Sequence, residues 1–62
     1  MSLKTEPNLP EHDEFYAKLM TVHRDLTEAE SLELNARLVL LLANHIGDMG
    51  VLEEAIAKAR QN

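Results

Sequence analysis

The feature that most constrains this chain is a helical segment, residues 28–46, that is apolar around most of its circumference. Its centre is an uninterrupted apolar run from Leu38 to Ala43. On helical geometry the apolar side chains of the segment cover an arc of roughly 220°. A helix on the surface of a globular protein carries an apolar stripe only a little wider than about 100°. The segment therefore needs cover from more than one side.

Start and stop signals define this helix and predict two neighbours. Thr27 and Glu30 have the spacing of a capping box, and Gly47 suits the left-handed residue that ends a helix. A first helix is predicted over about 10–25, with one apolar stripe made by Phe15, Leu19, Val22 and Leu26. A third is predicted over about 49–60, with a stripe made by Leu52, Ala55, Ile56 and Ala59. The sequence predicts an all-α fold, a small three-helix bundle over residues 10–62 preceded by a flexible lead over 1–9.

The length of the chain makes such a fold marginal. With 62 residues and 7.0 kDa there is room for one domain, and a domain of this size buries only about 60% of the surface of its unfolded chain. The sequence holds no Cys that could form a stabilising disulfide. The two flanking helices could just enclose the middle one in a monomer. Alternatively, one flank of the middle helix meets the same flank of a second chain, and we prefer this homodimer because it supplies burial that a short chain lacks.

The predicted chain-to-chain or partner surface lies on the middle helix. Asn35 projects into its apolar arc, where an unpaired buried amide would cost about 1–3 kcal/mol. It could bond a loop backbone or a neighbouring helix end, or it could fix the register of a helix interface as buried Asn does in coiled coils. The candidate interface residues are Leu34, Asn35, Leu38, Leu41, Leu42 and His45.

The sequence offers little for catalysis or metal binding. His12 and His23 share one face of the first helix but stand about 16 Å apart along its axis, too far for one metal ion. His45 is interpreted as a cation near a helix C-terminus, close to Asp48. No nucleophile elbow or phosphate-binding glycine loop is present. We therefore expect no enzyme activity, no cofactor and no catalytic or metal-ligating residue.

Charge and hydropathy bound the partners. Eleven acidic residues against six basic ones give a net charge of −5, which argues against nucleic acid or an anionic membrane as the main partner. The longest apolar run is far shorter than the ~20 residues of a membrane helix. A cytoplasmic location is expected.

The amino-acid sequence of the middle segment resembles that of a known family. The stretch from Leu34 to Asp48, followed by Val-Leu-Glu-Glu-Ala at 51–55, is similar to a family of short bacterial proteins catalogued as a domain of unknown function (DUF2783). Pro7-Asn8 and Phe15-Tyr16 also fit, so the resemblance covers nearly the whole chain. It implies no activity and no site residues. Its one contextual hint is that members resemble accessory genes beside catabolic oxidoreductases.

These observations predict a non-enzymatic helical interaction or assembly module that self-associates. One alternative is an accessory subunit that docks on a larger metabolic enzyme of oxidoreductase type. Another is a small metal- or ligand-binding protein.

Overall fold

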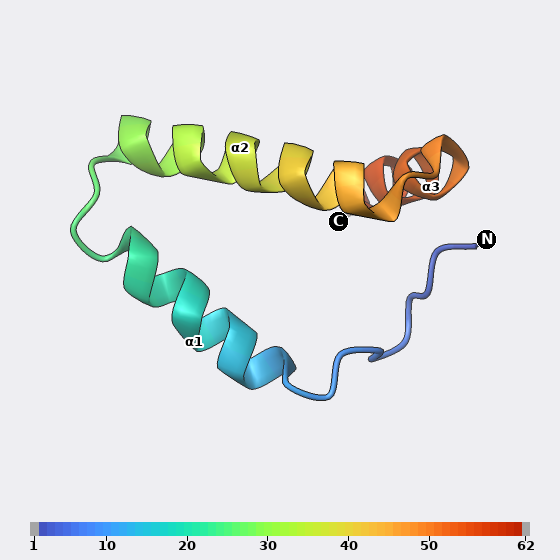
Figure 1. Cartoon of the computed structure of the whole chain (residues 1–62), viewed down its shortest axis with the longest axis horizontal. Coiled ribbons are helices and arrows are strands. Elements are labelled where there is room, and N and C mark those ends of the chain that lie inside the picture. The colour runs from blue at the N-terminus through green and yellow to red at the C-terminus, as the bar shows by residue number, and fades with distance from the viewer. Residues whose placement is uncertain (1, 62) are drawn as a thin grey trace.

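The computed structural model describes residues 2–61, which form three α-helices joined by short connections (Figure 1). Helix α1 is His12–His23, α2 is Glu28–Ile46 and α3 is Met49–Ala59. The described residues contain no β-strand, and the predicted all-α three-helix fold is confirmed. Residue 1 of the predicted lead and residue 62 of the predicted helical domain lie outside the described residues.

Both ends of α2 are set by the residues that predicted them. The Thr27 hydroxyl accepts a hydrogen bond from the Glu30 amide at 3.2 Å, and the Thr27 amide donates to the Glu30 carboxylate at 2.9 Å. At the other end Gly47 has a φ of 66°, in the left-handed region that lacks a steric penalty only for glycine, and its amide donates to the Ala43 carbonyl. Asp48 then caps α3 by accepting from the Val51 amide at 3.1 Å.

Helix α1 is shorter at both ends than the predicted range of about 10–25. Its N-cap residue, Glu11, makes no side-chain capping bond, and the Leu9 carbonyl accepts from the His12 amide in a turn that precedes the helix. At the C-terminal end the amide of Arg24 bonds the carbonyl of Thr21, which tightens the last turn and ends the helix at His23. Proline is favoured at the first position of a helix, but a proline does not by itself start a helix. Here Pro10 lies in the turn before α1.

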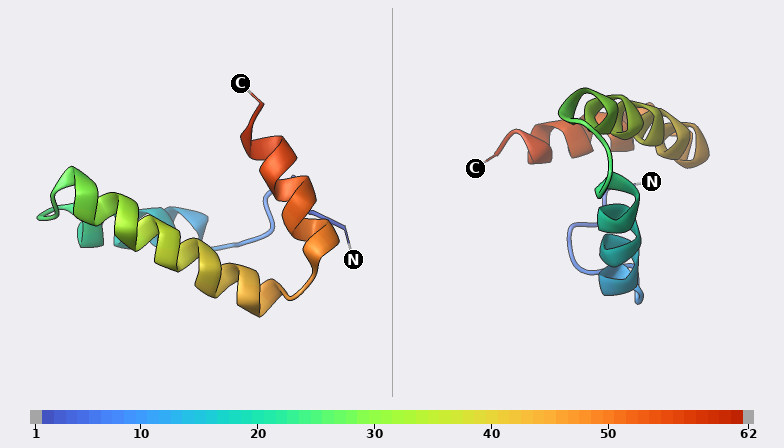
Figure 2. Two further views of the ribbon diagram at one scale, coloured as in Figure 1. Left: turned by 90° about the horizontal axis from the view of Figure 1, so that it is seen from above. Right: turned by 90° about the vertical axis from the view of Figure 1, so that its left-hand side faces the viewer.

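The helices form an open arrangement. From the connection 24–27, α1 and α2 diverge (Figure 1), while α3 folds back on a different side of α2 (Figure 2). The segment before α1 crosses to α3, where the Leu3 amide donates to the Glu54 carboxylate at 2.9 Å. As a result the chain runs around an opening rather than around a closed core.

Burial and dimensions agree with this openness. Among the described residues, Val51 is the one buried side chain, at 5% exposure. The accessible surface is 5687 Å², whereas a compact protein of this mass exposes about 4,000 Å². The radius of gyration is 13.1 Å, against about 10.5 Å for a compact chain of this length. The chain alone thus leaves the middle helix largely uncovered.

Candidate interaction surface

A small polar cluster joins α1 to α2 near their connection. The Nδ1 atom of His23 lies 2.9 Å from the Ser31 hydroxyl, and its Nε2 atom lies 3.0 Å from Oδ1 of Asn35. Because an amide oxygen only accepts, Nε2 carries the proton and donates. His23 and Ser31 are half-buried. One imidazole ring therefore holds the last turn of α1 against the first two turns of α2.

Asn35 was expected either to bond a nearby loop or helix end or to set the register of an interface. The structure places its partner in the same chain, on the last residue of α1. Asn35 itself is exposed rather than enclosed by apolar neighbours. Its present contact is a bond to the neighbouring helix end, made through a side chain.

The side of α2 that faces α1 becomes more exposed toward its C-terminal end. We call one set of α2 residues the α1-facing side, because all of them lie within about 40° of the direction of Leu38 around the helix. The set consists of Ser31, Leu34, Leu38, Leu42 and His45. Leu34 and Leu38 are half-buried, Leu42 is 48% exposed and His45 is exposed. This gradient follows from the divergence of the two helices, because α1 covers only the beginning of this side.

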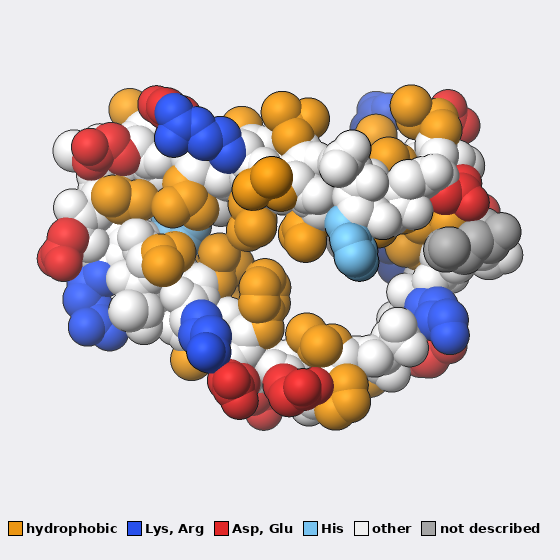
Figure 3. Space-filling model, in the orientation of Figure 1, with side chains coloured by type: hydrophobic (Ala, Val, Ile, Leu, Met, Phe, Trp, Pro, Cys, Tyr) orange, Lys and Arg blue, Asp and Glu red, His pale blue; other side chains and the backbone are white. Residues whose placement is uncertain are grey.

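Hydrophobic side chains line the opening that this divergence leaves. Figure 3 shows them on both sides of a gap through the middle of the molecule, with α2 along one edge. On α1, Phe15 is 45% exposed and Val22 is 51% exposed. Apart from His45 at its exposed end and Ser31 at its start, the α1-facing side that borders this gap consists of leucines.

The other flanks of α2 are also apolar and open. Leu32, Val39, Leu40 and Leu41 are 63–70% exposed. The Glu33–Arg37 ion pair forms a polar strip along the helix. On helical geometry this strip lies between Leu40 on one side and Leu41 on the other. The candidate interface residues thus fall into three groups: Leu34 and Leu38 pack partly within the chain, Asn35 belongs to the polar cluster, and Leu41, Leu42 and His45 remain exposed.

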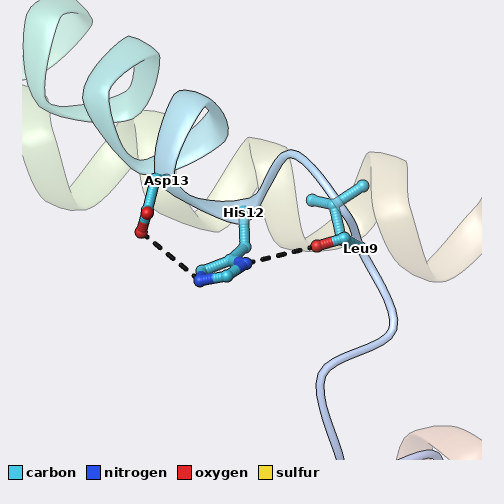
Figure 4. Close-up of polar contacts among 3 residues, drawn as sticks. All are labelled: Leu9, His12 and Asp13. Atoms are coloured by element: carbon cyan, nitrogen blue, oxygen red, sulfur yellow. Dashed lines mark hydrogen bonds and ion pairs between the residues drawn. The ribbon is translucent and has the colours of Figure 1, made fainter.

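The remaining polar groups make local contacts. His12 lies at the start of α1, where its Nδ1 atom is 3.3 Å from the Leu9 carbonyl oxygen and its Nε2 atom is 3.3 Å from the Asp13 carboxylate (Figure 4). Both of these side chains are mostly exposed. Among residues 2–61, no three His, Cys, Asp or Glu side chains gather closely enough to hold a metal ion.

The surface also has two shallow hollows, and both are open to solvent. One lies between the segment before α1 and α3, and the other lies on α2 beside the polar strip. The second is lined by Arg37, Leu40, Leu41 and Asn44.

These features define a small all-helical protein with an open apolar surface. The chain belongs to the family described as protein of unknown function (DUF2783), whose model matches residues 3–61. The resemblance carried by the segment from Leu34 to Asp48 is thereby confirmed. No curated protein matches the chain, and no solved structure does. In the part of the chain that the structure describes, no helix combines the length and apolarity needed to cross a membrane.

Proposed function

We propose that this protein is a non-enzymatic helical interaction or assembly module that self-associates, with a homodimer as the simplest form. The observation that supports the proposal is the mismatch between surface and mass. The chain exposes 5687 Å², which is about 1,600 Å² more than a compact protein of its size. Each partner in a stable protein complex buries about 800 Å², so the excess is large enough for extensive contact with other chains.

The chemistry of the exposed surface supports association with protein rather than with a charged ligand. The large hydrophobic side chains exposed on α2 are all aliphatic, and each of Leu32, Val39, Leu40 and Leu41 leaves more than half of its surface in water. Burying apolar surface contributes about 25 cal/mol per Å². A contact that covers these side chains would therefore stabilise both the fold and the assembly.

The test is the mass of the protein in solution as a function of its concentration. Sedimentation equilibrium from low to high micromolar concentration should show a dimer or larger species that dissociates on dilution, and the melting temperature should rise with concentration. A strict monomer at high micromolar concentration would contradict self-association.

A second candidate uses the same surface on a different chain. An accessory subunit that docks on a larger bacterial enzyme would bury the same exposed leucines, and a monomer in isolation would fit this role. Copurification from the native host separates the two, because a module that only self-associates would bring down no second protein in fixed proportion. A reducing compartment such as the cytoplasm suits a chain without cysteine, and it is the location we propose.

A further inference from the structure

Helix α2 carries a heptad pattern on the flank away from its α1-facing side. Alanine recurs every seventh residue, and a large aliphatic residue recurs every seventh residue between the alanines. The steps alternate between three and four residues, as at the two core positions of a coiled coil. This set lies roughly 80–180° around the helix from Leu38 and consists of Ala29, Leu32, Ala36, Val39, Ala43 and Ile46.

Exposure divides the heptad pattern into two parts. At its C-terminal end Ala43 is half-buried and Ile46 is 40% exposed, beside the turn that leads into α3. The other four residues are exposed, with Leu32 at 66% and Val39 at 63%. We call Ala29, Leu32, Ala36 and Val39 the open seam. It contains no charged or polar side chain, so pairing it would leave no such group buried without a partner.

The order of small and large residues on the open seam is complementary to itself in one direction only. In a parallel pair of identical helices each core position meets its own copy, so alanine would face alanine and Leu32 would face another leucine. The helices would then be too close in one layer and too far apart in the next. In an antiparallel pair each core position meets the other type of core position on the partner helix, so every alanine faces a large side chain. Layers of equal thickness result, and the two helix dipoles oppose each other favourably.

We propose that a second copy of this chain packs antiparallel on the open seam. Ala29 then lies opposite Val39 of the partner subunit, and Leu32 lies opposite Ala36 of the partner subunit. The inference rests on the proposed function and adds the contact face and the direction of the pair. The excess surface of about 1,600 Å² is twice the roughly 800 Å² that one partner of a standard interface buries. Because the open seam lies on a different flank of α2 from the α1-facing side, a pair formed on the seam does not cover that side.

Disulfide trapping tests this geometry directly, because the sequence has no native cysteine. The single variants Ala29→Cys and Val39→Cys are mixed, oxidised and digested, and the linked peptides are identified by mass spectrometry. The proposed pair brings residues 29 and 39 of opposite subunits together. Like residues of the two subunits then lie about 15 Å apart along the axis, beyond the ~7 Å between Cα atoms that a disulfide spans. A dominant 29–39 link is expected. Dominant 29–29 and 39–39 links would show a parallel pair and overturn the proposal.

A charge on the open seam provides an independent measurement. Ala36→Glu should shift the mass of the protein toward the monomer at a concentration where the wild type is a dimer. The matched control Ala57→Glu lies on an exposed position of α3 and should leave the mass unchanged. Helical content by circular dichroism separates dissociation from unfolding.

The outcomes also separate this inference from the function on which it rests. A dimeric wild type with no 29–39 link, or with Ala36→Glu still fully dimeric, would overturn the seam and leave self-association in place. A strictly monomeric wild type would overturn both.

Discussion

At the scale of single residues, His23 connects two helices that diverge soon after they meet. Its ring bonds Ser31 on one side and Asn35 on the other. The sequence placed His23 on one face of its helix and Asn35 within the apolar arc of the next, but did not link them. The link depends on how α1 is oriented relative to α2, which periodicity within either helix does not report. The available signal was three polar residues on facing apolar stripes, on either side of the short connection 24–27.

Replacing His23 should therefore loosen the α1–α2 pair. His23→Ala removes both ring contacts, and we expect a loss of about 1–2 kcal/mol in unfolding free energy. Thermal unfolding followed by circular dichroism at fixed protein concentration measures it. His12→Ala is the matched control, because the His12 side chain is 65% exposed and its polar contacts are to Leu9 and Asp13, which lie within three residues of it along the chain. Equal melting temperatures for the two variants would mean that the His23 cluster contributes nothing to stability.

At the scale of elements, the helix limits set by side-chain caps were predictable, and the uncapped ones were not. The bounds of α2 and the start of α3 follow from Thr27, Glu30, Gly47 and Asp48, whose partners lie within four residues along the chain. The start of α1 was misplaced because Glu11 makes no capping bond and a preceding turn takes Pro10. Local chemistry determines where these helices begin and end, whereas their mutual orientation requires contacts that are distant in sequence.

The capping box at the start of α2 can be tested with two identical substitutions. Thr27→Ala removes the hydroxyl that accepts from the Glu30 amide and should cost about 0.5–2 kcal/mol of unfolding free energy. Thr21→Ala makes the same chemical change inside α1, where the hydroxyl bonds the Ala17 carbonyl and alanine is the better helix former. We expect Thr21→Ala to be neutral or slightly stabilising. Chemical denaturation of both variants at one concentration gives the comparison, and similar losses would argue against a specific capping role.

At the scale of the whole molecule, the apolar arc predicted for the middle helix corresponds to real exposed surface. The sequence indicated that residues 28–46 need cover, but not which parts the flanking helices would leave open. Those parts follow from the divergence of α1 from α2 and the separate course of α3, seen in Figures 1 and 2. Leu34 and Leu38 are partly covered within the chain, while Leu41 and Leu42 are not. The predicted interface was thus one apolar helix face, which the fold divides between contacts inside the chain and contacts available outside it.

The isolation of Val51 as the one buried side chain among residues 2–61 has a calorimetric consequence. Unfolding increases the heat capacity because apolar surface becomes exposed to water. For compact domains the increase is about 12–15 cal/mol/K per residue. A dilute, dissociated chain should show well under this increment and a broad transition. At concentrations where chains associate, the increment should approach the ordinary value and the transition should sharpen. Scanning calorimetry across a dilution series measures both. A full increment in a sample shown to be monomeric would mean that the three helices close over one another in solution without a partner.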